Sequence, residues 1–409
     1  MKVQGTLIFL FGVLIAASAN AQIEYAGFVD TYHSLQTKEP NDTFSSRFCL
    51  RLEGHTESEN IFLFASLNAE KNYVLSDETG VDLHEGYLDY VSDQWDMRAG
   101  RQIIIWGKAD GIQITDIISP PDYTEFITRD LDEIRMPVDA LKLRWLGDTA
   151  NAEVIWIPFF KSAVLPSGDN PWAIPPEFPD DVDVYFNPTE EPEKKLKNGE
   201  IAGKLSFYSS GIDLALSAFY TWDDFPSMHR IVEKDADTKF VTFKPEHHRL
   251  TVFGLEFSKP LGELVIRGEA AFYKGKYFEP EDIDGQLFKK NSLNWLLGAD
   301  WYPGSNWTII VQFADSFVLD YDHRIEEDEH TMIATLNVSK KLLRETLTLS
   351  NMIYYSINDI DLLDRISVEY ALTDEFHISG GADIFSGDEG RFGAYEDNTQ
   401  VWIKAKYSF

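Results

Sequence analysis

Apolar and polar residues alternate along most of this chain, in stretches of about 10 to 14 residues. Residues 401–409 show the pattern clearly. One alternate set is Val401, Ile403, Ala405, Tyr407 and Phe409, and the other is Trp402, Lys404, Lys406 and Ser408. Side chains of a strand point alternately to its two faces, so the first set suits lipid and the second a watery lumen. An alternating last strand that ends on an aromatic residue predicts an outer-membrane β-barrel, with Phe409 as its assembly signal. We expect Phe409 to close against the first strand, near Ile23 to Tyr32.

Turn-forming residues separate the alternating stretches, and the connections are short and long in turn. The short connections are expected at 55–60, 92–94, 147–150, 209–211, 259–262, 303–306, 341–344 and 373–375. The long connections are expected at 107–137, 166–198, 223–246, 274–290 and 320–329. Counting one strand on each side of every connection predicts an all-β fold: a single antiparallel transmembrane barrel of about eighteen strands, with sixteen as the alternative. The barrel is expected to span residues 22–409, with short turns facing the periplasm and long loops facing outward.

The first 21 residues read as a secretory signal peptide. Lys2 precedes an apolar run from Leu7 to Ala17, and Ala19-Asn20-Ala21 is a small-x-small cleavage site. Cleavage is therefore expected after Ala21. A strand of a soluble sandwich could share the C-terminal pattern, but an export signal together with that pattern favours the outer membrane of a Gram-negative bacterium.

Composition narrows the function. Aromatic residues make up 14% of the chain, which suits the two aromatic girdles of a membrane barrel. The formal net charge of −32 disfavours nucleic acid as a partner. This acidity either keeps an exported chain soluble before insertion or forms an acidic vestibule that gathers cations. The single cysteine, Cys49, excludes an internal disulfide.

Catalytic and metal-binding motifs are missing from the sequence. Neither G-x-S-x-G nor H-E-x-x-H occurs. The adjacent His247 and His248 would point to opposite faces of a strand, and His377, Ser379 and Asp383 would be spread along about 20 Å of strand. We therefore expect no enzyme activity, no cofactor and no metal, with an outer-membrane hydrolase as a distant alternative.

Charged residues in the middle of strands are expected to face the lumen, because Arg or Lys on the lipid side costs about 2 to 4 kcal/mol at the bilayer centre. Strand parity assigns to the lumen wall Arg51, Glu53, Asp89, Arg98, Lys142, Arg144, Lys204, Arg267, Glu269, Arg365, Glu369, Asp383 and Lys404. These charges either pair across neighbouring strands or form a binding track for an anionic or amphipathic solute.

The connection 107–137 is the most unusual segment. It carries apolar residues at Ile112, Ile114, Ile117 and Ile118, which a freely solvated loop would leave unpacked. The economical interpretation is that it folds into the barrel mouth, with a short helix over 128–135 that Thr128 caps. Its candidate pore residues are Lys108, Asp110, Asp116, Pro120, Pro121, Asp122, Arg129, Asp130 and Arg135. Either it plugs the lumen with self-satisfied ion pairs or it forms a constriction that selects solutes.

The same region resembles a known family, the RND-transporter-associated outer-membrane proteins of the domain-of-unknown-function 1302 type. The family shares a strand ending in G-R-Q-x-x-x-W-G, a turn like N/S-P-x-D and an element like R-x-P. The matching positions are Gly100, Arg101, Gln102, Trp106, Gly107, Ser119, Pro120, Pro121, Asp122, Arg135 and Pro137. The chain departs from the family at Lys108 and Ala109, where Glu-Ser is common. The resemblance implies a monomeric or porin-like barrel that passes hydrophobic molecules in concert with an inner-membrane exporter.

These observations predict a porin-like channel that passes small or amphipathic solutes across the outer membrane. The alternative is an export or lipid-trafficking barrel that acts with an inner-membrane RND-type transporter. The expected partners are outer-membrane lipid, lipopolysaccharide and the barrel-assembly machinery. The pattern predicts neither the solute nor the direction of transport.

Overall fold

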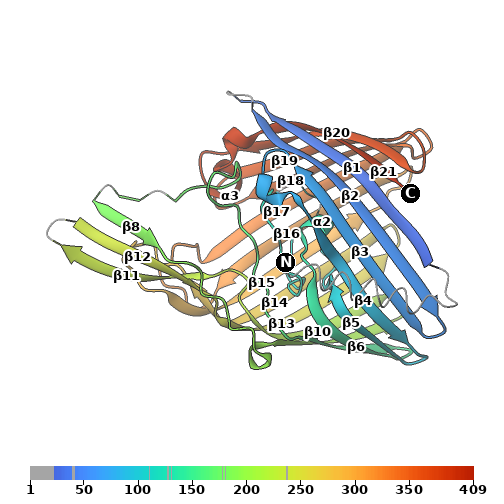
Figure 1. The fold of residues 1–409 in the computed structure, drawn as a ribbon, viewed down its shortest axis with the longest axis horizontal. Coiled ribbons are helices and arrows are strands. Elements are labelled where there is room, and N and C mark those ends of the chain that lie inside the picture. The colour runs from blue at the N-terminus through green and yellow to red at the C-terminus, as the bar shows by residue number, and fades with distance from the viewer. Residues whose placement is uncertain are drawn as a thin grey trace.

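The computed structural model describes residues 23–38, 42–109, 111–126, 129, 131–176, 178–179, 181–235 and 238–409. The predicted signal peptide and its cleavage site lie outside these residues. Within them, eighteen antiparallel strands form one closed barrel, as the alternation predicted (Figure 1). The chain is therefore an all-β protein.

The barrel strands follow the sequence around the wall. Their bounds are β1 Ile23–Gln36, β2 Thr43–Ser58, β3 Ile61–Asn72, β4 Gly80–Val91, β5 Trp95–Gln102, β6 Val138–Leu146, β7 Ala150–Ile157, β9 Glu200–Ser209, β10 Ile212–Trp222, β13 Arg249–Leu261, β14 Leu264–Phe278, β15 Phe288–Trp301, β16 Trp307–Val318, β17 His330–Leu342, β18 Leu347–Ser356, β19 Asp361–Ala371, β20 Phe376–Ser386 and β21 Gln400–Ser408. The short helices are α2 Leu131–Ile134 and α3 Gly390–Gly393, with 3-10 turns at Ser76–Glu78, Leu196–Asn198 and Glu396–Asn398. Among the described residues, no helix is long and apolar enough to cross a membrane.

The barrel closes where the last strand meets the first. β1 pairs with β2 on one side and with β21 on the other, and Phe28 lies opposite Ser408. Beyond this pair, Gly27 and Phe409 exchange two backbone hydrogen bonds of 3.0 Å. Closure of Phe409 against the first strand, which the sequence predicted, is confirmed.

The two faces of the wall differ as the alternation requires. On β19, Ile366, Val368 and Tyr370 are exposed on the outer face. Arg365, on the opposite parity, bonds Asp383 across the β19–β20 pair at 2.9 Å. A barrel in a bilayer needs an apolar outer face, because lipid does not solvate charged side chains. Its inner face borders water and can be polar.

A second, smaller sheet was not predicted. β8 (Val182–Phe186), β11 (Ser227–Asp235) and β12 (Thr238–Glu246) lie in connections that the sequence analysis interpreted as loops. β11 and β12 form a hairpin, and β8 adds to β12 in parallel. This external sheet projects from the end of the barrel that carries the long connections (Figure 1).

Candidate functional site inside the barrel

Residues 103–137, the inner segment, leave the wall at the end of β5 and return to it at the start of β6. The only helix in the described part of this segment is α2, so the longer helix expected over 128–135 is wrong; its expected cap, Thr128, lies outside the described residues. The helix ends at Ile134 because the residues around it make a strand-like contact with residues 120–122. The backbone N–H of Asp122 donates to Ile134, and that of Met136 donates to Pro120, at 2.7 and 2.9 Å. This pairing holds Arg135 in an extended conformation.

The family motif sits where the chain turns off the wall. Gly100 has a φ of 134°, and a Cβ there would lie 2.3 Å from the carbonyl oxygen of Gly86, so no other residue fits without a shift. Gln102 donates from Nε2 to the carbonyl of Ala140 at 3.0 Å. Trp106 then points its indole N–H at Glu153, at 2.7 Å. These contacts fix the direction in which the inner segment enters the lumen.

Glu269 of β14 binds the start of the inner segment. Its Oε1 accepts the backbone N–H groups of Lys108 and Ala109, the latter at 2.7 Å. Its Oε2 accepts the N–H and the hydroxyl of Thr115, at 3.1 and 2.8 Å. The carboxylate is only 4% exposed. One wall side chain that parity assigned to the lumen therefore satisfies four donors of the inner segment.

Glu125 binds the other end of the inner segment to the opposite wall. It is buried, and its carboxylate receives Arg47 at 3.0 Å, Arg129 at 2.7 Å and Ser45 at 2.9 Å. Burial alone would raise the pKa of the Glu125 carboxyl, but Arg129 and Arg47 beside it hold that pKa below its ordinary value. Arg129 also bonds Glu70 on β3 at 2.7 Å. Sequence reasoning missed Glu125, and the i, i+4 spacing to Arg129 was the only local signal.

The remaining charges of the inner segment are mostly paired as well. Arg135 bonds Asp116 at 2.8 Å, and the N–H of Trp106 donates to Asp116 at 3.0 Å. Burial raises the pKa of Asp116, although Arg135 opposes the shift. Lys108 lies 3.5 Å from Asp213 on β10.

The other predicted residues of this segment act through the backbone or cannot be placed. The carbonyls of Pro120 and Pro121 accept hydrogen bonds from the N–H groups of Met136 and Val164. The Asp122 carboxylate accepts the N–H of Thr124 at 2.9 Å. The predicted residues Asp110 and Asp130 lie outside the described residues.

Apolar contacts also hold the inner segment against the wall. Ile114 is buried in a cluster with Leu250 and Val252 of β13 and Leu296 of β15. The same cluster includes Trp172, from the connection between β7 and β9, which is 1% exposed and contacts the rings of Phe44, Phe126, Phe385 and Tyr395. Trp172 was not among the predicted site residues, because nothing in its acidic, Pro-rich neighbourhood indicates burial.

Most predicted wall charges have a partner on a nearby strand or on the inner segment. The contacts are Arg98–Asp89 at 2.7 Å, Arg144–Asp96 at 2.7 Å, Lys204–Glu256 at 2.7 Å, Arg365–Asp383 at 2.9 Å, Lys404–Glu133 at 3.6 Å, His377–Glu369 at 3.3 Å, Arg51–Asn68 at 2.7 Å and Arg267–Asp300. Lys142 lies opposite Arg98, and Glu53 lies opposite Ser66. This arrangement is the one that the cross-strand interpretation describes.

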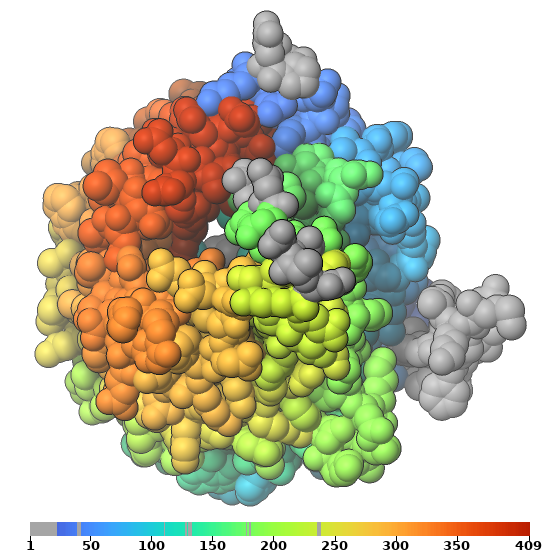
Figure 2. All heavy atoms as spheres, turned by 90° about the vertical axis from the view of Figure 1, so that its left-hand side faces the viewer, coloured from blue at the N-terminus to red at the C-terminus, as the bar shows by residue number. Residues whose placement is uncertain are grey.

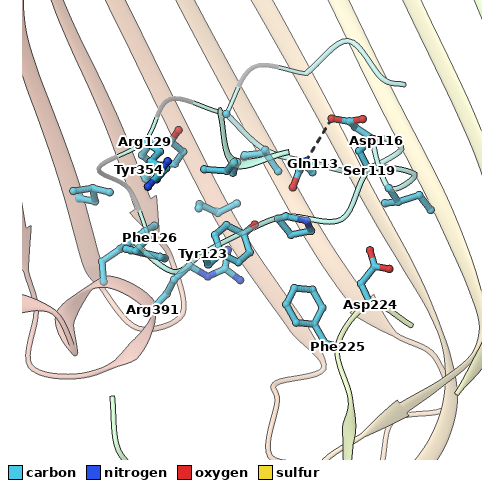
Figure 3. A pocket seen from close by; sticks show the side chains of 18 of the residues that line it. Gln113, Asp116, Ser119, Tyr123, Phe126, Arg129, Asp224, Phe225, Tyr354 and Arg391 are labelled. Atoms are coloured by element: carbon cyan, nitrogen blue, oxygen red, sulfur yellow. Dashed lines mark hydrogen bonds between the residues drawn. The ribbon is translucent and has the colours of Figure 1, made fainter. Parts of the chain in front are cut away.

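A cavity of about 520 Å³ lies beside the inner segment (Figure 3). Tyr123 and Phe126 of the segment line one side, Tyr354 of β18 lines another, and Arg391 of α3 lies at its edge near Tyr123. We call it the aromatic cavity. Figure 2, which looks onto the end that carries the external sheet, shows a hollow between the orange-to-red C-terminal part and the green and yellow middle of the chain.

Two more cavities are polar. One, of about 340 Å³, lies between the inner segment and β1–β4 and is lined by Arg47, Arg51, Glu70 and Arg101 among others. Another, of about 510 Å³, lies along β18–β21 near the short turns and includes Ser367, Glu369 and Lys404. The inner segment therefore divides the lumen and leaves space along the C-terminal wall.

Comparisons with known proteins show the family and the fold of the chain. Residues 30–364 match a family model described as "Protein of unknown function (DUF1302)". The chain belongs to this family. The match covers most of the barrel and confirms the resemblance that the motif around Trp106 indicated. No curated protein matches the chain.

Porins and channels are among the solved structures to which the chain is similar. OccAB4 of Acinetobacter baumannii is 10% identical with a TM-score of 0.55, and the match covers 95% of this chain and 98% of that one. OmpF of Salmonella typhi, solved with daunomycin, is 8% identical with a TM-score of 0.49, over 95% and 98% of the two chains. DcaP, also of A. baumannii, is 11% identical with a TM-score of 0.46, over 96% and 98%. The similarity to OccAB4 shows the fold alone, which is a porin-like outer-membrane barrel.

Proposed function

We propose that this DUF1302 barrel is an outer-membrane channel in which the inner segment is a fixed constriction. The observation that carries the proposal is the position of that segment. It is bonded to Glu269 on one wall and to Arg47 on the other, yet it leaves the aromatic cavity open beside β17–β19. A segment held at both ends narrows the lumen without closing it.

Small amphipathic molecules are the solutes that best fit the aromatic cavity. Its volume of about 520 Å³ is within the range of roughly 300 to 1,000 Å³ of ligand sites. Tyr123, Phe126 and Tyr273 offer flat apolar contact, and Arg391 offers a cation at the edge. A solute with an apolar body and one acidic or polar group would contact both the aromatic rings and Arg391.

The polar cavity along β18–β21 continues this route toward the short turns. Arg365 lines the aromatic cavity, and Ser367 and Glu369, the next inward residues on β19, line the polar one. Inward residues of a strand are about 7 Å apart, so the two cavities follow one another along a single wall. We propose that solutes pass along this wall.

The test replaces residues 109–136 by a short Gly-Ser linker and measures single-channel conductance in planar bilayers. Conductance should rise at least about twofold, because an eighteen-stranded barrel without an inner segment encloses an aqueous channel. The matched control replaces residues 229–244, most of the external hairpin, which lies outside the lumen. Both variants must show the heat-modifiable migration of a folded barrel.

Uptake into liposomes then tests the solute class. An aromatic carboxylate should enter faster than a neutral sugar of equal size through the parent protein, and the linker variant should lose this preference. A folded linker variant that conducts no better than the parent would contradict the constriction. Equal rates for both solutes through the parent would contradict the proposed route.

Export or lipid trafficking together with an inner-membrane transporter stays a prediction. A partnership with an inner-membrane RND-type transporter rests on the family resemblance, and the family's description assigns no function. Crosslinking in cells from an external loop and from a short turn, such as 92–94, distinguishes the two: a periplasmic partner would be captured only from the short turn.

A further inference from the structure

Three potential metal ligands meet where the external sheet joins the barrel. His229 is on β11, Glu246 is the last residue of β12, and His248 is the residue before β13. Each offers one ligand atom, and the three atoms all lie within 4.8 Å of one another. The group is separate from the inner segment and its cavities.

The register of the β11–β12 hairpin explains why these residues lie close together. His229 lies opposite Lys244, so Glu246 is its diagonal neighbour on the same face of the β11–β12 pair. The link at 247–248 then turns the chain back toward the wall and brings His248 onto that face. Only a folded hairpin creates this group, because His229 and His248 are 19 residues apart.

The distances between the three ligand atoms are compatible with one bound metal ion. The two Nε2 atoms are 2.7 Å apart, and Oε2 of Glu246 is 3.8 Å from Nε2 of His229. Two imidazoles on a tetrahedral Zn²⁺ place their nitrogens about 3.3 Å apart, given Zn–N bonds of about 2.0 to 2.1 Å. The observed separations lie on either side of this value. The three atoms, all within 4.8 Å of one another, can therefore bind one ion once the side chains rotate and the hydrogen bond between His229 and His248 opens.

The surroundings orient the rings. His248 stacks on Tyr277 of β14 with ring centroids 4.0 Å apart. Lys289, the nearby cation, lies over the Tyr277 ring at 5.0 Å.

The neighbouring His247 has a different role. Its Nδ1 bonds the carbonyl of Asp223 at 2.8 Å, and its ring packs edge-on against Phe160. As neighbours in an extended chain, His247 and His248 point to opposite faces and do not bind one ion together. The pair that meets in the structure is His229 and His248.

We propose that His229, Glu246 and His248 bind one divalent transition-metal ion of the Zn²⁺ class. Imidazole nitrogen with one carboxylate is a donor set for Zn²⁺, Ni²⁺ or Cu²⁺ and not for Ca²⁺ or Mg²⁺, which take oxygen ligands. Since His229 and Glu246 belong to the external hairpin and His248 stacks on the wall, the bound ion fastens the external sheet to the barrel.

The experiment titrates Zn²⁺ into the mature, full-length barrel, folded in detergent and purified without a polyhistidine tag, by isothermal calorimetry. Excess Mg²⁺ in the buffer occupies the acidic loops. One equivalent of Zn²⁺ should bind. The double variant H229Q plus H248Q should bind about 100-fold more weakly or worse, because even the loss of second-shell partners commonly costs about 10- to 100-fold.

The matched control is His323→Gln, which removes a histidine that is 91% exposed in another long connection. It should bind Zn²⁺ like the parent. Heat-modifiable migration confirms that each variant is folded. Equal Zn²⁺ affinity in the parent and the double variant would overturn the site, and so would a parent that binds no Zn²⁺.

Hydrogen exchange tests the fastening. Zn²⁺ should slow amide exchange over residues 227–248 in the parent, EDTA should reverse the effect, and the double variant should not respond. Tight Zn²⁺ binding with unchanged exchange would overturn the fastening role.

Discussion

The barrel wall and the inner segment are held by different forces. The wall is a closed ladder of eighteen strands, in which backbone pairing is repeated around the ring. The inner segment has few backbone pairs and is held by two buried carboxylates, Glu269 and Glu125, and by apolar contacts. Stability is therefore spread over many bonds in the wall and concentrated in a few side chains in the segment. We therefore expect a substitution at one of these carboxylates to loosen the segment while the wall stays intact.

The largest effect is expected at the seam of the wall. Deletion of Phe409 removes both hydrogen bonds to Gly27 and the aromatic end of β21. Since the aromatic end of the last strand is the expected assembly signal, most of the protein should fail to reach the membrane. The measurement is the amount of heat-modifiable protein in outer-membrane fractions. Phe409→Tyr, which keeps an aromatic ring, is the control and should assemble normally.

The next effect is expected at Glu269. Glu269→Ala leaves four donors of the inner segment without their acceptor, and each hydrogen bond to a charged group contributes about 1.5 to 3 kcal/mol. The start of the segment should detach, and conductance should rise while the barrel stays folded. Glu53→Gln, a lumen-wall change away from these contacts, should conduct like the parent. A folded Glu269→Ala variant with parental conductance would show that Glu125 and the apolar contacts hold the segment without Glu269.

The same contrast explains what the sequence could predict. The wall was predictable because alternation with period two assigns a face to every residue, and turn residues mark each strand end. Strand number, closure at Phe409 and the inward side of Arg365 and Glu269 all follow from that rule. The rule uses only neighbours along the chain.

The inner segment and the metal ligands depend on contacts that no local pattern encodes. Glu269 meets Ala109 across 160 residues, and Ser45 meets Glu125 across 80. The external sheet has a weak signal in the sequence, because Val241 and Phe243 alternate with polar residues. Both side chains are buried in the structure. That stretch lies within a long, charged connection, and the sequence analysis therefore treated it as a loop.

A smaller effect is expected from acid, through Glu125. Its pKa in the folded protein lies below the ordinary 4.5, so the ionised carboxylate stabilises the segment fully above about pH 4.5 and loses this effect as the pH falls through the lower folded value. Conductance of the parent should therefore rise in strong acid. Glu125→Gln removes the carboxylate that pairs with Arg47 and Arg129, of which Arg129 keeps its bond to Glu70. The variant should therefore already conduct more at pH 6 and respond less to acid. The same acid response in both proteins would assign the effect to other carboxyls.

The smallest effect is expected in the wall itself, from Lys142→Glu combined with Arg144→Glu. Arg144 is paired with Asp96 at 2.7 Å, so its charge contributes little to the field in the lumen. Lys142 lies opposite Arg98, which bonds Asp89, and thus it carries most of the local positive charge. The double variant should shift the reversal potential toward cations, and Lys142→Glu alone should account for most of the shift. Arg144→Glu alone places a carboxylate beside Asp96 and should lower thermal stability more than it changes selectivity. A larger selectivity change from Arg144→Glu than from Lys142→Glu would mean that the Asp96 pair opens in the membrane.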